Sequence, residues 1–157
     1  MPDPDRRHRF VERLGAALTD AGLQRLPARV FAALVIDEDG RMTAAEIAEA
    51  VGASPASVST AVNYLGQISF LHRERERGSR RDVYVVDDDA WLQALRRERL
   101  TYGPMIDTFS TALDGMAEDD PARRRLLLMR EFLHFVEEEL DAMGARWEER
   151  KRSLGLG

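Results

Sequence analysis

Residues 55–67 combine side chains that form hydrogen bonds with a complete absence of charge. At about 100° per residue, Val58, Val62 and Leu65 fall on one side of a helix, which predicts that this side is buried. The opposite side is small and polar, and it carries Ser57, Ser59, Thr60, Asn63, Tyr64 and Gln67. Asn and Gln can pair with adenine edges, and Ser and Thr can reach bases or phosphates. The pattern favours a helix that enters the major groove of DNA over an ordinary polar surface helix.

A second group of candidate contact residues is a run of arginines. In an extended strand Arg73, Arg75 and Arg77 lie on one side and His72, Glu74 and Glu76 on the other, with Arg80 and Arg81 at the tip of a turn. Residues 73–82 contain five arginines and three acids. Such a hairpin can contact phosphates or a minor groove. The alternative is an edge hairpin that its alternating charge keeps soluble; next to the polar helix, we favour DNA contact.

Other residue types with reactive side chains form no recognisable site. His8, His72 and His134 are far apart and have no partner at metal-ligand spacing, which favours structural or surface roles. Residues 137–139 are a glutamate run whose members point about 100° apart, as on a solvated helix. The sequence has no phosphate-binding glycine loop, nucleophile elbow or catalytic triad spacing. We expect neither an enzyme nor a bound metal or cofactor.

The polar helix is preceded by strong signals for helix ends. Thr43 and Glu46 match a capping box, which predicts a short helix up to Val51. Gly52 can end that helix in the left-handed conformation, and Ser54 followed by Pro55 supplies an N-cap and a first-turn proline for the next. The sequence therefore predicts a helix, a tight turn and a second helix.

After Leu65 the apolar period changes from that of a helix to that of strands. Residues 71–77 and 81–86 are predicted to form two strands joined around Gly78 and Ser79. A helix–turn–helix followed by a hairpin is the order of a winged helix. The expected fold is mostly α-helical with a small β-hairpin wing, and residues 22–88 are expected to form the winged domain.

Long helices flank this segment. Helical periodicity predicts helices over 5–21, from about Pro27 to Val35, and over 90–116, where Gly103 and Pro104 are expected to kink or interrupt the helix. The last helix, 122–152, carries a heptad seam. The seam residues are Leu126, Met129, Leu133, Val136, Leu140, Met143 and Trp147. Such a seam needs a partner helix, from the same chain or from a second subunit, and we expect residues 5–21 and 89–152 to form a dimerisation region.

The composition limits the classes of protein. The chain has 157 residues, 44% of them apolar, and a net charge of −5, so nucleic-acid contact must come from a local basic patch. The absence of cysteine excludes disulfides, thiolate catalysis and Cys-ligated metal centres. The first residues lack the basic start and apolar run of an export signal, and no stretch approaches the length of a membrane span. We expect a cytoplasmic protein without a membrane partner.

Residues 43–86 resemble the winged helix–turn–helix of MarR-type bacterial transcriptional regulators. The run from Gly78 to Tyr84, GSRRDVY, together with the long C-terminal helices, is most similar to the branch that includes the glycine-betaine synthesis repressors. In that family two subunits pair through N- and C-terminal helices, the helix after the turn reads the major groove, and the wing contacts the minor groove. The likeness extends over nearly the whole chain.

The resemblance assigns roles to particular residues. It implies that Ser57, Ser59, Thr60, Asn63, Tyr64 and Gln67 read bases. It implies wing contacts by Arg75, Arg77, Arg80 and Arg81. Dimer contacts are expected from Leu14, Leu18, Leu133, Val136, Leu140, Met143 and Trp147.

We therefore expect a sequence-specific regulator that binds double-stranded DNA as a homodimer and represses transcription at a pseudo-palindromic promoter site. The alternative is a winged-helix module that binds only proteins. A small-molecule effector stays open and unidentified. Its candidate pocket residues, for which core packing is the preferred interpretation, are Trp91, Tyr102, Met105, Phe109 and Met116.

Overall fold

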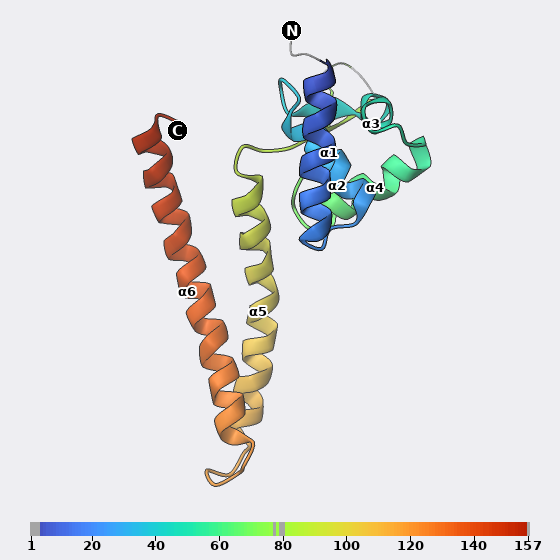
Figure 1. Cartoon of the computed structure of the whole chain (residues 1–157). Helices are drawn as coiled ribbons and strands as arrows, with labels where there is room; N and C mark the ends of the chain where they lie inside the picture. The colour runs from blue at the N-terminus through green and yellow to red at the C-terminus, as the bar shows by residue number, and fades with distance from the viewer. Residues whose placement is uncertain (1–3, 77, 79–80, 157) are drawn as a thin grey trace. The chain divides into compact units, whose positions relative to one another are not determined.

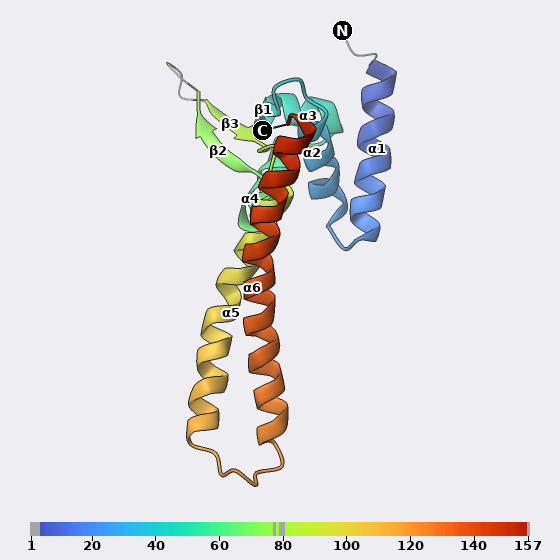
Figure 2. The ribbon, with the colours of Figure 1, turned by 90° about the vertical axis from the view of Figure 1, so that its left-hand side faces the viewer.

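The computed structural model describes residues 4–76, 78 and 81–156. The chain forms two compact units, one ending at Gln93 and the other beginning at Ala94. Its elements, in chain order, are α1 (Pro4–Asp20), α2 (Arg25–Val35), β1 (Arg41–Thr43), α3 (Ala44–Val51), α4 (Pro55–Gln67), β2 (His72–Arg75), β3 (Asp82–Val85), α5 (Ala90–Asp114) and α6 (Arg123–Leu154). Figures 1 and 2 show the predominance of helix and the small sheet, which confirms the expected fold class.

The helix ends around α3 follow from local side-chain chemistry. The Thr43 hydroxyl accepts the Glu46 backbone N–H at 3.3 Å, and a Glu46 carboxylate oxygen accepts the Thr43 backbone N–H at 2.7 Å. These bonds form the predicted capping box. The N–H of Thr43 is the main cause that holds the pKa of Glu46 below its ordinary value, and the Thr43 hydroxyl adds to it. At the other end, Gly52 has a φ of 62°, as predicted for a left-handed cap.

The sheet contains a strand that the sequence analysis did not predict. Its order is β1-β3-β2, with both pairs antiparallel, so that β3 lies in the centre. Thr43 and Glu74 are the partners of Val83 on its two sides. The hairpin strands β2 and β3 are shorter than the predicted 71–77 and 81–86. The strand β1 has three residues, too few to show a period, and it exists because β3 offers it a free edge.

The core of the first unit is built around α2. Phe31 and Leu34 are 1% and 0% exposed, and they meet the buried side of α4, where Val58 and Leu65 are both 0% exposed. The Phe31 ring also belongs to an aromatic cluster with Phe70 and Trp91, in which ring centroids lie 4.9–5.8 Å apart. This cluster joins α2 to the loop after α4 and to the first turn of α5.

The second unit is a pair of long helices. The helix α5 runs without a break through Gly103 and Pro104, so the predicted interruption does not occur. Pro104 is exposed, and water can satisfy the carbonyl that a proline leaves without its N–H partner. One guanidinium nitrogen of Arg123 donates to the carbonyls of Leu113 and Met116 at 2.9 and 3.1 Å, which closes the connection between α5 and α6. Within the described ranges, no helix is long and apolar enough to cross a membrane.

The capping box gives a stability prediction. Thr43→Ala removes the hydroxyl that accepts the Glu46 N–H and should lower the free energy of unfolding by about 1 kcal/mol, as measured by urea denaturation at neutral pH. Thr111→Ala is the matched control, because Thr111 is exposed and its hydroxyl donates to the Asp107 carbonyl of the same helix, α5. We expect the control to leave stability unchanged or slightly raised. Equal losses in both variants would contradict the assignment.

Candidate nucleic-acid interface

The start of α4 is fixed by its own cap. The Ser54 hydroxyl accepts the backbone N–H of Ser57 at 3.2 Å and lies 2.8 Å from the Ser57 hydroxyl, and Pro55 occupies the first turn. The Thr60 hydroxyl donates to the Ala56 carbonyl at 3.3 Å. Of the predicted reading residues, Ser57 and Thr60 therefore have local hydrogen bonds that a ligand would have to share or replace.

The helix α4 divides into an apolar and a polar side as its periodicity predicts. The apolar side, Val58, Ala61, Val62 and Leu65, is at most 2% exposed. Ser57, Ser59, Thr60, Asn63 and Gln67 are exposed, and Tyr64 is half-buried. Because the buried side anchors the helix, its uncharged polar side is presented to solvent as a group.

The β2–β3 hairpin places the arginines of β2 on its outer face. Arg73 and Arg75 are exposed, as is Arg81 just before β3, and one Arg73 guanidinium nitrogen lies 3.3 Å from an Asp82 carboxylate oxygen. Arg77 and Arg80, also predicted as contacts, lie outside the described residues. The described part of the hairpin thus brings three arginines into the same unit as α4.

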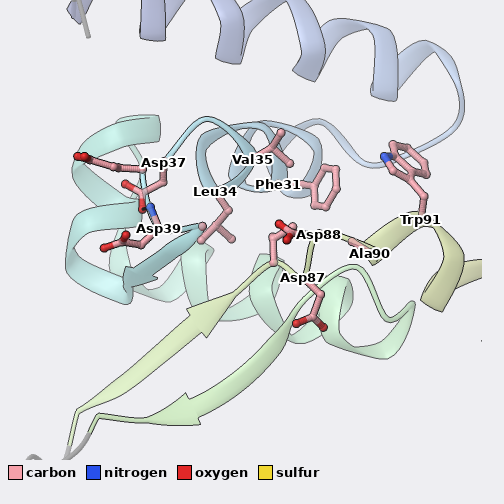
Figure 3. Close-up of a pocket in the computed structure, with 12 residues that line it drawn as sticks. Phe31, Leu34, Val35, Asp37, Asp39, Asp87, Asp88, Ala90 and Trp91 are labelled. Atoms are coloured by element: carbon pink, nitrogen blue, oxygen red, sulfur yellow. Dashed lines mark hydrogen bonds between the residues drawn. The ribbon is translucent and has the colours of Figure 1, made fainter. Parts of the chain in front are cut away.

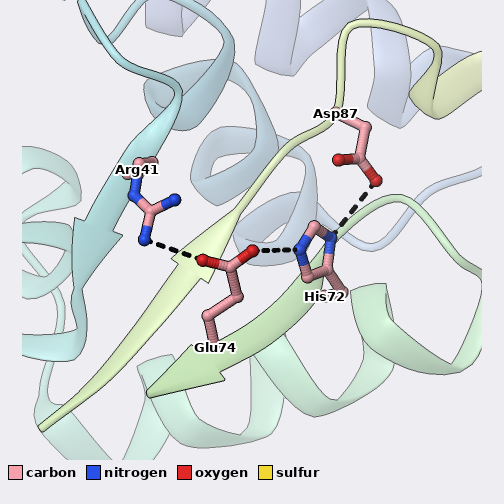
Figure 4. Close-up of polar contacts among 4 residues, drawn as sticks. All are labelled: Arg41, His72, Glu74 and Asp87. Carbon is pink, nitrogen blue, oxygen red and sulfur yellow. Dashed lines mark hydrogen bonds and ion pairs between the residues drawn. The ribbon is translucent and has the colours of Figure 1, made fainter. Parts of the chain in front are cut away.

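The acidic residue between these arginines is part of a separate polar cluster, Arg41, His72, Glu74 and Asp87 (Figure 4). Glu74 pairs with Arg41 at 2.7 Å and with His72 at 3.0 Å, and the other His72 ring nitrogen lies 3.2 Å from Asp87. Cross-strand partners share a face, so His72 and Glu74 lie on the side of buried Val83 and Val85, opposite Arg73 and Arg75. The hydrogen bond from His72, followed by that from Arg41, holds the pKa of Glu74 below its ordinary value.

The alternating charges of the hairpin are therefore sorted by face. Glu74 meets its partners on the inner face, whereas the outer face carries Arg73 and Arg75 together with Asp82, the cross-strand partner of Arg75. The sequence analysis placed His72 and Glu74 on one side but missed Arg41, because Arg41 enters the cluster through the unpredicted strand β1. Across the described ranges, no three His, Asp or Glu side chains are arranged to hold a metal ion.

The predicted effector-pocket residues do not form one site within either unit. Trp91 belongs to the first unit, where it is 53% exposed and lines a cleft of about 440 Å³ (Figure 3). Tyr102, Met105, Phe109 and Met116 belong to the second unit. The other acidic and apolar residues that line the cleft include Phe31, Val35, Asp37, Asp39, Asp87 and Asp88. The charged residues among the described lining residues are all acidic, which is unfavourable for a phosphate ligand.

The predicted dimer residues differ in exposure. Leu18 is 5% exposed and packs inside the first unit, whereas Leu14 is half-buried. Leu133, Val136, Leu140, Met143 and Trp147 are half-buried along α6. The same helix also carries an exposed apolar stripe, of which only Met129 belongs to the heptad seam. The stripe consists of Leu128, Met129, Phe132 and Phe135, which are 47–62% exposed.

Comparison with known proteins finds similar chains among transcriptional regulators. A family model for MmpR5-like MarR family transcriptional regulators matches residues 89–150, and one for the sugar-specific transcriptional regulator TrmB matches residues 18–88. The HTH-type transcriptional regulator MmpR5 of Mycobacterium tuberculosis is 29% identical over 137 residues, which are 86% of this chain and 83% of the relative. The two halves of the chain are thus similar to models of transcriptional regulators, and the match to MmpR5 extends over most of its length.

Two further matches are also transcriptional regulators. A crystal structure of a transcriptional regulator has a TM-score of 0.76 and 26% identity, over 91% of this chain and 98% of that one. The HTH-type regulator YwhA of Bacillus subtilis, described as uncharacterized, is 30% identical over 90 residues, 57% of this chain and 60% of the relative. The relatives that these comparisons name are transcriptional regulators.

The polar cluster of Arg41, His72, Glu74 and Asp87 predicts a pH-dependent stability. Because the pKa of Glu74 is lowered by folding, its stabilisation is complete above the ordinary glutamate pKa of about 4.3 and is lost as pH falls through the lower folded value. Glu74→Gln should therefore unfold at a lower urea concentration than the wild type at pH 7, and the gap should narrow as the pH falls below the ordinary glutamate pKa.

Glu76→Gln provides the control for this measurement, since Glu76 is the next acid on the same side of the hairpin and is exposed. We expect no comparable gap for this variant. A Glu74→Gln gap that persists unchanged in acid would show that the ion pairs with Arg41 and His72 do not stabilise the fold.

Proposed function

We propose that this protein is a homodimeric repressor that recognises a specific double-stranded DNA sequence through α4 and the hairpin. The supporting observation is the polar side of α4, which is exposed, uncharged and small while its other side is anchored in the core. A helix with these properties can approach base edges closely in the major groove. The proposed readers are Ser57, Ser59, Thr60, Asn63, Tyr64 and Gln67.

The hairpin supplies the positive charge that α4 lacks. The outer face of the hairpin carries exposed Arg75 and is followed by exposed Arg81, and arginines in such a position suit phosphates or a narrow minor groove. The proposed wing contacts are Arg75, Arg77, Arg80 and Arg81. This division resolves the conflict between the net charge of −5 and a DNA ligand, because the positive charge is local.

The dimer is proposed from the apolar surface of α6. Phe132 and Phe135 are 62% and 56% exposed on the same helix face, and exposed aromatic side chains of this kind are typical of an interface between proteins. We assign a second copy of the chain as the partner, with the half-buried seam residues Leu133 to Trp147 and Leu14 of α1 at the edges of the contact. The two-fold symmetry of such a dimer matches a pseudo-palindrome whose half-sites lie about one helical turn apart.

Four finer assignments stay proposals. Repression follows if the dimer occupies a promoter, and the cytoplasm is where a bacterial promoter is accessible. The resemblance of residues 78–84 to the glycine-betaine synthesis repressor branch stays a prediction, as does control by a small effector. An effector would have to bind one arrangement of the two reading helices better than another in order to change DNA affinity.

Base reading can be tested with single substitutions. A duplex enriched by the wild-type protein from a random-sequence pool serves as the specific probe, and its scrambled version as the control DNA. Asn63→Ala or Gln67→Ala should weaken binding to the enriched duplex by about 1–3 kcal/mol and relax the preference at one half-site position, as measured by fluorescence anisotropy. Unchanged affinity for both duplexes in both variants would show that the wrong face of α4 has been assigned.

Phosphate contact by the hairpin has a different signature. Replacing Arg80 and Arg81 together with Ala should weaken binding to both duplexes and lower the slope of log affinity against log salt by about two. Arg124 and Arg125 of α6, both exposed, form the matched control pair for the same loss of charge. If the wild-type protein binds no duplex at low salt, the alternative of a protein-binding winged helix replaces this proposal.

The dimer contact is tested in the stripe itself. Phe132→Glu places a charge at its most exposed aromatic position and should raise the dimer dissociation constant about thirtyfold or more in sedimentation velocity. His134→Glu adds a charge at an exposed position of the same helix turn and should leave the dimer intact. A wild-type protein that stays monomeric at micromolar concentration would contradict the proposal.

A further inference from the structure

Arg29 of α2 connects three helices of the first unit. Its Nε donates to a Glu12 carboxylate oxygen of α1 at 2.9 Å, and one of its terminal nitrogens lies 2.6 Å from the same oxygen. The other terminal nitrogen donates to the backbone carbonyl of Val51 at 2.9 Å. The Arg29 side chain is 24% exposed, so these contacts are partly shielded from water. The planar guanidinium group thus holds α1 with one edge and the end of α3 with the other.

The carbonyl that Arg29 binds belongs to the last residue of α3. The turn itself satisfies two earlier carbonyls, because the Gly52 N–H donates to Glu49 at 3.3 Å and the Ala53 N–H donates to Ala48 at 3.0 Å. The Val51 carbonyl instead accepts from Arg29, whose positive charge is also favourable at a helix C-terminus. Residue 55, where α4 begins, is only four residues further on. A displacement at Val51 is therefore passed directly to the start of α4.

The contact with α1 is equally close. Gly15 lies one turn after Glu12, and a Cβ at Gly15 would be 2.9 Å from Cγ of Arg29. A side chain there would displace the stem of an arginine whose far end is already held at two points. Glycine at position 15 therefore lets α1 and α2 approach each other, and Glu12 keeps the guanidinium group turned so that it can reach Val51.

We propose that Arg29 is the positioning residue of the reading helix: the Glu12–Arg29–Val51 contact fixes the turn before α4 and makes its orientation depend on the placement of α1. This inference rests on the proposed function of α4. It adds residues that lie off the proposed DNA-contacting face, and it gives α1 a role in DNA recognition besides the one in dimerisation.

The charge of Glu12 allows a test in which the expected change in DNA affinity is opposite to the change that electrostatics alone would cause. Loss of a carboxylate from an acidic protein favours DNA binding through electrostatics alone. If Glu12 positions Arg29, Glu12→Ala should instead weaken binding to the duplex that the wild-type protein enriches, while scrambled DNA is bound no more weakly than before. We expect the ratio of the two affinities to fall about fivefold. Asp20→Ala, which removes an exposed carboxylate from the same helix, is the matched control and should preserve the ratio.

Arg29→Lys is the second variant. Lysine keeps the positive charge, but its single ammonium group cannot reproduce the fork that meets Glu12 and Val51 together. The specific-to-scrambled ratio should fall as for Glu12→Ala, while the salt dependence of binding stays that of the wild type. Dimer formation is checked by sedimentation, and binding is measured well below each melting temperature. A smaller folded fraction would lower both affinities equally and leave their ratio unchanged.

The outcomes separate this inference from the proposed function. A reduced ratio in Glu12→Ala and Arg29→Lys, with Asp20→Ala unchanged, supports the positioning role. Wild-type ratios in both variants overturn it and leave DNA recognition by α4 intact. A wild-type protein that enriches no sequence overturns the proposed function, and this inference with it.

Discussion

The burial of one side of α4 is the constraint on which the rest of the proposed recognition surface depends. Val58, Val62 and Leu65 are nearly inaccessible to solvent against Phe31 and the rest of α2, and complete burial of such side chains is worth about 1.5–3 kcal/mol each. Because a helix is rigid, fixing this side fixes the direction of the opposite one. A polar face of short side chains can then be held in one orientation without making any contact of its own.

Charged side chains in the first unit are also separated onto opposite faces of one element, the strand β2. The pleat of β2 turns Glu74 toward Arg41 and His72 and turns Arg73 and Arg75 outward. Further carboxylates line the acidic cleft near Trp91, and one of them, Asp87, also pairs with His72 of the polar cluster. An acidic protein can in this way present a locally basic edge to an anion. Its net charge alone would have suggested a positively charged partner.

The features that could be predicted from the sequence are those whose partners lie within a few residues. The capping box of Thr43, the left-handed Gly52 and the two sides of α4 each follow from spacing within one or two helical turns, and the structure contains all of them. The strand β1, the Arg41–Glu74 pair and the Arg29–Val51 hydrogen bond join segments more than twenty residues apart. No local pattern identifies such pairs, because the chain contains many carboxylates and carbonyls that an arginine side chain could bind. The roles of individual residues in DNA contact and in dimerisation stay predictions.

The aromatic cluster of the first unit has a practical consequence. The chain has two tryptophans, and Trp91 is packed against Phe31 and Phe70 in one unit while Trp147 lies in the other. Each unit therefore contains its own intrinsic fluorophore. With either indole replaced by phenylalanine, the emission of the remaining one reports on a single unit, so that the cooperativity between the two halves of the molecule becomes a spectroscopic observable without any added label.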